Sequence, residues 1–226
     1  MESDNKKPVV IGSDEESIVE PGYFGKTTDN IKIIENFVEL EDIKKLQAFF
    51  PTINEWMDSG EDVFSEDGTC LYSASYWANR QLDSKLIEKL NIEVHQIIYK
   101  YIDKMKNELE AHFNVKVKSR HPVIVCWRPG TEQRPHADKQ LNDGRPNPFP
   151  TYDLNSLFYH NDDFVGGELY YPEFDIEVKP RPGLAVFHPG DVNYLHGVKM
   201  IESGLRYTTP SFYTITELGR QAPPSI

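Results

Sequence analysis

The stretch VIVCWRPGTEQRPHAD, residues 123–138, joins an apolar run to a histidine and an aspartate that lie two positions apart. Valine, isoleucine and tryptophan favour β-strands, and side chains at positions i and i+2 of an extended segment point to the same face. His136 and Asp138 can therefore offer an imidazole nitrogen and a carboxylate oxygen to one cation. Because the same pair is also common in solvated turns, a metal site needs a third ligand from elsewhere in the chain.

Short strand-like runs continue after this stretch. From about residue 115 onward, apolar or alternating segments are separated by Gly, Pro, Asn and Asp, which is typical of closely spaced β-strands. They include YDLNSLFYHND (152–162), GGELYYPE (166–173) and LRYTTPSFYTIT (205–216). Helical patterns come first in the chain and strands follow, so the sequence predicts a mainly β protein, a β-sandwich or jelly roll buttressed by helices.

The supporting elements are expected in the N-terminal half. We expect a short strand at residues 31–38 and a helix at 41–50, which ends before a proline. A longer helical periodicity runs over residues 83–113, with Asp83 or Ser84 as its N-cap. The strand residues expected on one face are Ile31, Ile33 and Phe37. The apolar face of the long helix comprises Leu86, Leu90, Val94, Ile97, Tyr101, Met105 and Leu109.

Length and composition indicate one folded domain with an appended arm. A chain of 226 residues with 38% hydrophobic content can bury one sizeable core. Residues 1–25 are polar and acidic, which predicts a flexible arm. A single domain is then expected over residues 26–226, with its core at about 115–216. The N-terminus lacks the basic start of a signal peptide, and no apolar run reaches the roughly 18 to 20 residues of a membrane span.

Charge and cysteine content narrow the partners. The formal net charge of -12 opposes binding to phosphate backbones and anionic lipids, and no basic stripe with interleaved aromatic residues offsets it. We therefore expect neither a nucleic acid nor a membrane as partner. The two cysteines, Cys70 and Cys126, form no CxxC pair, which favours a reducing, cytoplasmic setting.

Two histidines compete for the role of third ligand. His188 ends an apolar strand beside a Pro-Gly turn, whereas His196 is followed ten residues later by Arg206. Arg206 lies in an apolar strand, where a cation is costly to bury unless it meets an anion. Its planar guanidinium can hold a carboxylate through two hydrogen bonds. A salt bridge within the protein is the simpler alternative. The other histidines, expected to be structural or to line a pocket, are His95, His112, His121 and His160.

Taken together, these residues favour a particular metal chemistry. Two histidines and one carboxylate on one side of a metal leave about three of six octahedral positions open, which suits ferrous iron with a bidentate co-substrate and O2. Zinc more often takes a closed tetrahedral site with further histidine or thiolate ligands. An arginine beyond the third ligand would then hold the distal carboxylate of a keto acid.

The order of these motifs resembles the 2-oxoglutarate- and Fe(II)-dependent oxygenases, and within them the prolyl 4-hydroxylase-like branch. The resemblance extends over roughly residues 31–216. It includes IKIIENFV, the long helix, the stretch 123–138, FYHNDD, GGELYYPE, VKPRPGLAVFHPGD, LHGV and GLRYTTPSFY. It implies a double-stranded β-helix core of the jelly-roll, cupin-like type. It also implies a dioxygenase that needs Fe(II), 2-oxoglutarate and O2, with ascorbate as an accessory reductant.

The resemblance assigns roles to residues of this chain. His136, Asp138 and His196 would be the iron ligands, and Arg206 would bind the C5 carboxylate of 2-oxoglutarate. Thr208, on the same strand face as Arg206, would be a second contact to that carboxylate. Two aromatic residues, Trp127 and Tyr159, are expected near the co-substrate pocket. The implied reaction decarboxylates 2-oxoglutarate to succinate and CO2 and hydroxylates an unactivated C–H bond.

Departures from the family pattern bear on the substrate. Collagen-type prolyl 4-hydroxylases usually have lysine where this chain has Arg206, commonly tyrosine at Gln133, and often tryptophan at Phe212. The expected substrate is a peptide or protein carrying a prolyl residue. A free amino acid or other small metabolite is the alternative, and a non-catalytic cupin-like module that binds metal and carboxylate is another. Residues 139–153, polar and proline-rich, directly follow Asp138 and are expected to form a lid over the substrate.

Overall fold

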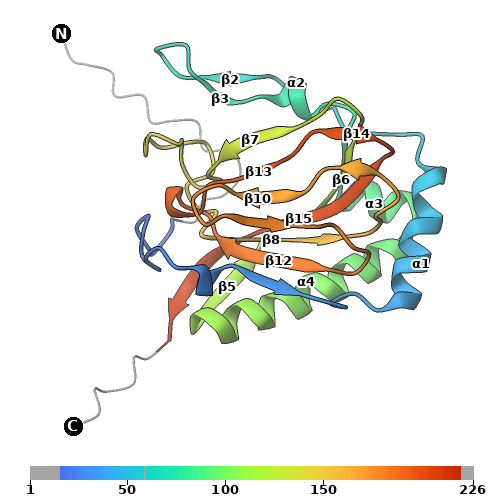
Figure 1. Cartoon of the computed structure of the whole chain (residues 1–226), viewed down its shortest axis with the longest axis horizontal. Coiled ribbons are helices and arrows are strands. Elements are labelled where there is room, and N and C mark those ends of the chain that lie inside the picture. The colour runs from blue at the N-terminus through green and yellow to red at the C-terminus, as the bar shows by residue number, and fades with distance from the viewer. Residues whose placement is uncertain (1–15, 59, 220–226) are drawn as a thin grey trace.

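The structure is a computed structural model, which describes residues 16–58 and 60–219. It combines a layer of helices with antiparallel sheets (Figure 1). The helices are α1 (Leu40–Phe49), α2 (Ala74–Trp77), α3 (Ser84–Leu90) and α4 (Ile92–Phe113), with 3-10 turns η1 (Thr28–Asn30), η2 (Phe50–Thr52) and η3 (Val192–Tyr194). The strands are β1 (Lys32–Ile34), β2 (Val63–Phe64), β3 (Cys70–Tyr72), β4 (Gln81–Asp83), β5 (Val115–Ser119), β6 (Val123–Trp127), β7 (Gln133–His136), β8 (Leu154–Tyr159), β9 (Val165–Gly166), β10 (Leu169–Tyr171), β11 (Ile176–Val178), β12 (Ala185–Pro189), β13 (His196–Val198), β14 (Ile201–Ser203) and β15 (Arg206–Leu218).

Two sheets define the framework. The larger has seven strands in the order β1-β12-β8-β15-β6-β4, with β5 pairing beside β15. The smaller has four strands in the order β11-β10-β13-β7. A cavity of about 870 Å³ is lined by residues of both sheets. The prediction of a mainly β protein with supporting helices is therefore confirmed at the level of layers and strand content.

Helices α1, α3 and α4 cover one face of the larger sheet, whereas α2 lies beside the β2–β3 hairpin (Figure 1). Their apolar side chains share one cluster with the inward-facing residues of β8, β12 and β15. The predicted long helix is in fact two helices, because Asn91 interrupts it with φ -160° and ψ 103°. Asn91 also accepts a hydrogen bond from the Val94 backbone N–H and so caps α4, as Asp83 caps α3. Asparagine is a strong N-cap residue, which explains why the chain restarts the helix there.

The first strand is shorter than predicted. Only Lys32–Ile34 pairs with another strand, and it lies at the edge of the larger sheet beside β12. Ile31 and Phe37 are buried as expected, but Ile33 is 45% exposed. An edge strand of three residues has neighbours on one side only, and Ile33 does not share the burial of Ile31 and Phe37. Helix α1 agrees with the predicted helix to within one residue at each end.

Residues 16–25 belong to the predicted arm, and they lie along the domain. Val19 is buried in the main hydrophobic cluster, and Phe24 packs against Phe113 with ring centroids 4.6 Å apart. The rest of the predicted arm, residues 1–15, lies outside the described residues. Both cysteines are free thiols, and within residues 16–58 and 60–219 no helix is long and apolar enough to span a bilayer.

Candidate metal centre

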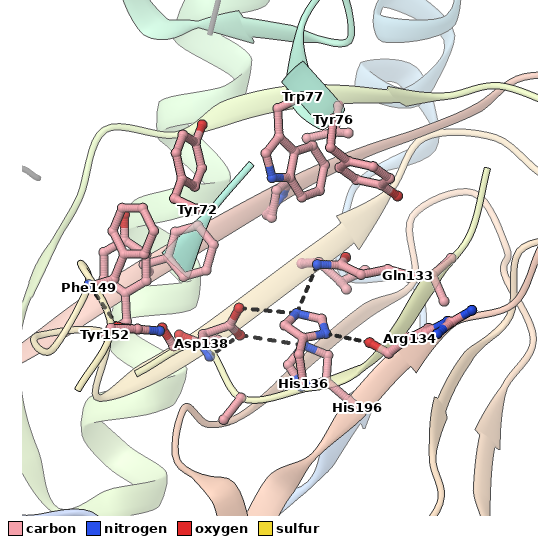
Figure 2. A pocket seen from close by; sticks show the side chains of 18 of the residues that line it. Tyr72, Tyr76, Trp77, Gln133, Arg134, His136, Asp138, Phe149, Tyr152 and His196 are labelled. Carbon is pink, nitrogen blue, oxygen red and sulfur yellow. Dashed lines mark hydrogen bonds and ion pairs between the residues drawn. The ribbon is translucent and has the colours of Figure 1, made fainter. Parts of the chain in front are cut away.

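Three predicted ligands meet where β7 and β13 pair. His136 ends β7 and lies directly opposite His196, the first residue of β13, in the antiparallel register. Asp138 follows two residues after His136, so its carboxylate reaches the same face (Figure 2). One potential ligand atom from each of the three side chains lies within 4.8 Å of the others. The sequence-predicted set is thus brought together by strand pairing between segments far apart in the chain.

Backbone carbonyls orient both imidazole rings. The Nδ1 of His136 lies 2.9 Å from the carbonyl oxygen of Arg134, and the Nδ1 of His196 lies 3.1 Å from that of Tyr194. Because a carbonyl oxygen only accepts hydrogen bonds, each Nδ1 carries a proton, so Nε2 is the ring nitrogen left to act as a metal ligand. The Nε2 atoms each approach the carboxylate of Asp138 to 3.4 Å. Orientation of ligand histidines through the other ring nitrogen is usual at protein metal sites.

The electrostatics suit a divalent cation. Burial by itself raises the pKa of Asp138, but the nearby imidazoles of His196, His136 and His188 lower it to about 2. Burial and the neighbouring His188 hold the pKa of His196 well below its usual value. At neutral pH the cluster therefore presents an ionised carboxylate and a neutral imidazole. Burial opposes the charged form of His136, but the hydrogen bond and charge of Asp138 outweigh burial and raise its pKa. A metal would bind the form in which Nε2 is deprotonated.

His188 lies beside the cluster without joining it. It is 3% exposed on β12, and its ring centroid lies 4.3 Å from that of His196. Its Nδ1 contacts the carbonyl of Pro189 at 2.9 Å, and burial lowers its pKa. Among the described residues, the group with ligand-like spacing contains His196 and not His188. The remaining histidines do not belong to this group. His95 and His112 lie on α4, His160 is buried in the core, and His121 lines the cavity.

Asn155 supports the carboxylate, and sequence reasoning did not identify it. It lies on β8, is 3% exposed, and donates from Nδ2 to Oδ2 of Asp138 at 2.5 Å. Its Oδ1 has no hydrogen-bond partner in the described part of the chain. Gly190 packs closely against Asn155 and leaves no room for a side chain, because an added Cβ would lie 2.0 Å from the Tyr152 carbonyl oxygen and 3.0 Å from Asn155 Nδ2. Nothing local marks Asn155 as special, because its partner lies on another strand.

Arg206 begins β15 and faces the same cavity. It is 1% exposed, and burial lowers its pKa. Its Nε has no hydrogen-bond partner among the described residues, and its Nη2 lies 3.5 Å from the Tyr159 hydroxyl. The guanidinium carbon lies over the rings of Trp127, at 5.2 Å, and Tyr159, at 5.0 Å. In the part of the chain that the structure describes, no carboxylate forms a salt bridge with Arg206, so the alternative of a structural salt bridge has no partner to support it.

Alternate residues of β15 line the cavity. Arg206, Thr208, Pro210 and Phe212 all contribute to its wall, as the two-residue period of a strand requires. Thr208 is 2% exposed and so lies deep in the wall, on the face expected from the sequence. Trp127 also lines the cavity, and its indole Nε1 is buried without a partner among the described residues. Unpaired donors on Trp127 and Arg206 indicate a place for an anion.

Aromatic side chains form two walls above the metal-binding cluster (Figure 2). On one side Phe149, Tyr152 and Phe212 stack in sequence, with centroids 4.9 and 4.1 Å apart. On the other side Trp77 packs edge-on against Trp127 at 5.6 Å. The remaining wall residues come from β3 and α2 and are Tyr72 and Tyr76. Sequence reasoning left residues 53–80 unassigned, although the aromatic run CLYSASYW (70–77) was a usable signal.

Two positions that depart from the family pattern face the site. Gln133 lies on β7, and its Nε2 is 3.0 Å from Nε2 of His136 (Figure 2). Phe212 lies in the stacked aromatic wall. Both side chains therefore border the space where a substrate would approach the metal.

Residues 139–153 border the cavity, as predicted, and form a compact loop. A bridge joins Gln140 to Pro146, and Asn147 donates to the Asp138 carbonyl at 2.9 Å. Arg145 connects the loop to the hairpin of β2 and β3 through Asp67, at 2.8 Å. The loop and the hairpin thus form a continuous rim on one side of the cavity.

Comparison with solved structures identifies the fold. The viral collagen prolyl hydroxylase of Paramecium bursaria Chlorella virus-1, in its 2OG complex, matches 83% of this chain and 97% of its own at 14% identity, with a TM-score of 0.55. A prolyl hydroxylase of Trichoplax adhaerens, in complex with a hypoxia inducible factor peptide fragment, matches 83% and 84% at 17% identity, with a TM-score of 0.58. A 2OG-Fe(II) oxygenase family protein of Burkholderia pseudomallei matches 85% and 88% at 14% identity, with a TM-score of 0.56.

Sequence comparison is weaker and points the same way. Prolyl 3-hydroxylase 1 of Gallus gallus is 25% identical over an alignment of 151 positions, and the match covers 56% of this chain. The chain spans about a fifth of the length of that curated relative, 21%. No protein-family model matches the chain. Taken with the structural neighbours, the chain has the fold of 2-oxoglutarate- and Fe(II)-dependent oxygenases and resembles their prolyl hydroxylases.

Proposed function

We propose that this fold carries a 2-oxoglutarate- and Fe(II)-dependent dioxygenase that hydroxylates an unactivated C–H bond of a peptidyl prolyl residue. One observation carries the proposal: the cluster of His136, Asp138 and His196 shares a cavity with Arg206, a buried arginine whose Nε has no partner among the described residues. A structural metal site would not require an anion-binding arginine beside it. In this proposal the two larger sheets form the double-stranded β-helix core that such enzymes share.

The donor set fits Fe(II). Two neutral imidazole Nε2 atoms and one carboxylate occupy one side of a cation and leave positions open on the other side. The ordering contacts from the carbonyls of Arg134 and Tyr194 already hold the rings in place. When bound, Fe(II) with 2-oxoglutarate and O2 supplies the oxidising chemistry and releases succinate and CO2. The protein's own task is to orient these groups and to hold the substrate.

Arg206 is the anchor for the co-substrate in this proposal. Its guanidinium would pair with the C5 carboxylate, and the hydroxyl of Thr208 and the indole N–H of Trp127 would be further donors. A carboxylate there would satisfy donors that are otherwise buried without partners. Because Arg206 is fixed at the start of β15 and packed against two aromatic rings, it would set the position of the keto group relative to the metal.

The cavity size and its walls support a peptide substrate. Its volume of about 870 Å³ lies at the upper end of the range for small-molecule sites, roughly 300–1,000 Å³, so it has room for a co-substrate and part of a second molecule. Aromatic walls are a common surface for proline-rich peptides. One structural neighbour is described in complex with a peptide fragment, which supports the same substrate class here.

Anaerobic reconstitution tests the proposal. The protein would be loaded with Fe(II) and 2-oxoglutarate and then exposed to O2 with a panel of proline-containing peptides and free amino acids, with succinate as the readout. We expect peptide-dependent succinate, and none from a His196→Ala control. Succinate with free amino acids alone would replace the peptidyl substrate with a small metabolite. No succinate with any candidate despite full iron occupancy would favour a binding module without turnover.

A further inference from the structure

A short N-terminal segment is tied to both turns that carry the metal-binding side chains. We call residues 16–22 the strap. At one end the strap contacts Lys139, the residue that directly follows Asp138. At the other end it contacts Asp191, which lies five positions before His196. The strap is far from the cluster in sequence and contributes no side chain to it, so its contacts need another explanation.

Lys139 is a buried ammonium whose hydrogen bonds depend on the strap. The residue is 6% exposed, and its Nζ donates to Ser17 Oγ at 3.0 Å, to the Val19 carbonyl at 2.7 Å and to Asp153 Oδ1 at 2.6 Å. An ammonium has three N–H donors, so its full set of acceptors is present. The strap supplies two of the three. Ser17 Oγ also donates to Asp153 Oδ1 at 2.6 Å, which closes the network.

The second contact reaches the other metal-binding turn. The backbone N–H of Gly22 donates to Oδ2 of Asp191 at 2.8 Å, and Asp191 is 4% exposed. Its neighbour Gly190 accepts, through its carbonyl, hydrogen bonds from the backbone N–H groups of Asp138 at 3.0 Å and Lys139 at 2.9 Å. The strap therefore braces the point where the turn after β7 meets the turn before β13.

We propose that the strap is a positioning element of the metal centre, acting through Lys139 and Asp191. The inference rests on the proposed function, because it assumes that the cluster binds a metal. If the strap leaves, Lys139 keeps one of three acceptors and becomes a poorly paired buried charge, which is costly enough for the side chain to rearrange. The turn that holds Asp138 then loses its anchor. Outer-shell partners of metal ligands typically change metal affinity by about 10- to 100-fold.

Two neighbouring strap residues provide a matched pair of variants. Val19 is 6% exposed and Ile18 is 52% exposed, so the same change to aspartate disrupts strap packing at one position and leaves it intact at the other. Titration of the full chain with Mn(II), followed by the electron paramagnetic resonance signal of the free ion, gives the affinity without any turnover. We expect Val19→Asp to bind Mn(II) about tenfold more weakly and Ile18→Asp to match the wild type.

If Val19→Asp does not fold, the effect of metal binding on the strap can be measured in the wild type instead. If the strap favours the metal-bound state, then metal binding must favour the docked strap by the same factor. Amide hydrogen exchange in residues 16–22 of the wild type should therefore slow about tenfold when Mn(II) is added. Lys139→Met should remove this response, whereas Lys44→Met, at an exposed ion pair on α1, should retain it.

The possible results distinguish failure of the strap proposal from failure of the proposed metal centre. Equal Mn(II) affinity in the folded Val19→Asp and Ile18→Asp variants, or strap exchange that ignores Mn(II), would overturn the positioning role while leaving the proposed dioxygenase intact. Failure of the wild type to bind Mn(II) at all would overturn both proposals.

Discussion

Replacing Arg206 with methionine should make the ligand-free protein more stable and its response to 2-oxoglutarate weaker. The guanidinium is 1% exposed and its Nε is unpaired among the described residues. Replacing buried charged groups with apolar residues of similar size is often neutral or stabilising, by up to about 4 kcal/mol. Lost cation–π contacts with Trp127 and Tyr159 offset about 1–2 kcal/mol of that gain. We expect a net gain of about 1–2 kcal/mol in the free energy of unfolding.

The loss of co-substrate binding can be worked out separately. Removing charge-assisted hydrogen bonds should raise the apparent dissociation constant for 2-oxoglutarate at least about tenfold, or ~1.4 kcal/mol. At a 2-oxoglutarate concentration of about 100 times the wild-type dissociation constant, ligand binding stabilises the wild type by about 2.7 kcal/mol. The same concentration would stabilise Arg206→Met by about 1.4 kcal/mol or less.

Thermal unfolding followed by circular dichroism measures both effects in one experiment. With Mn(II) present and no 2-oxoglutarate, the melting temperature of Arg206→Met should rise by about 2–8 °C, since each kcal/mol shifts a domain of this size by about 2–4 °C. Added 2-oxoglutarate should then raise it by about half as much as in the wild type. Arg181→Met is the matched control, because Arg181 forms an exposed ion pair with Glu35. A variant less stable than the wild type, with an unchanged response to 2-oxoglutarate, would refute this account of Arg206.

Three further predictions concern buried residues near the metal-binding cluster and in the core. His196→Ala should abolish Mn(II) or Fe(II) binding in a titration while His188→Ala retains it, and metal occupancy that follows His188 would show that the third ligand is wrongly assigned. Asn155→Ala should weaken metal binding about tenfold, because the metal-facing carboxylate loses its 2.5 Å donor; unchanged affinity would remove that role. Burial lowers the pKa of His160 to about 3. Below about pH 6.5 this histidine is protonated in the unfolded chain but stays neutral in the folded protein. The free energy of unfolding therefore falls as the pH drops from 6.5 towards 3. Between pH 6 and pH 4, urea unfolding should show that His160→Gln loses about 2 kcal/mol less stability than the wild type; an equal loss in the two proteins would contradict this account of His160.

The sequence predicted the parts of the site that obey local periodicity. His136 and Asp138 are two positions apart and reach the same face, and Arg206 and Thr208 share one face of β15. In each case a strand's two-residue period was enough. The choice of His196 over His188 needed the position of Arg206 as well, because His188 also ends an apolar run beside a turn.

Other features depend on contacts that no local pattern records. Asn155 donates a hydrogen bond to Asp138 from a different strand. Lys139 donates hydrogen bonds to Ser17 and Val19, which lie more than 100 residues earlier in the chain. A lysine in a polar, proline-rich segment is normally solvated, so burial at this position could not be expected. The prediction of one long helix was wrong because a local signal was missed. The apolar periodicity continues across Asn91, but Asn91 ends α3 and its side chain caps the start of α4.

The charges of the cavity explain why metal and co-substrate belong together. Asp138 is ionised, because the neighbouring imidazoles lower its pKa to about 2 despite burial, and Arg206 is a buried cation. Both side chains line the same cavity. A divalent metal alone would leave two uncompensated positive charges in a buried space, which is costly. 2-Oxoglutarate is a dianion that would approach the metal with one carboxylate and Arg206 with the other. In the proposed function the two negative charges of 2-oxoglutarate would offset the two positive charges of the metal, so each ligand should favour binding of the other.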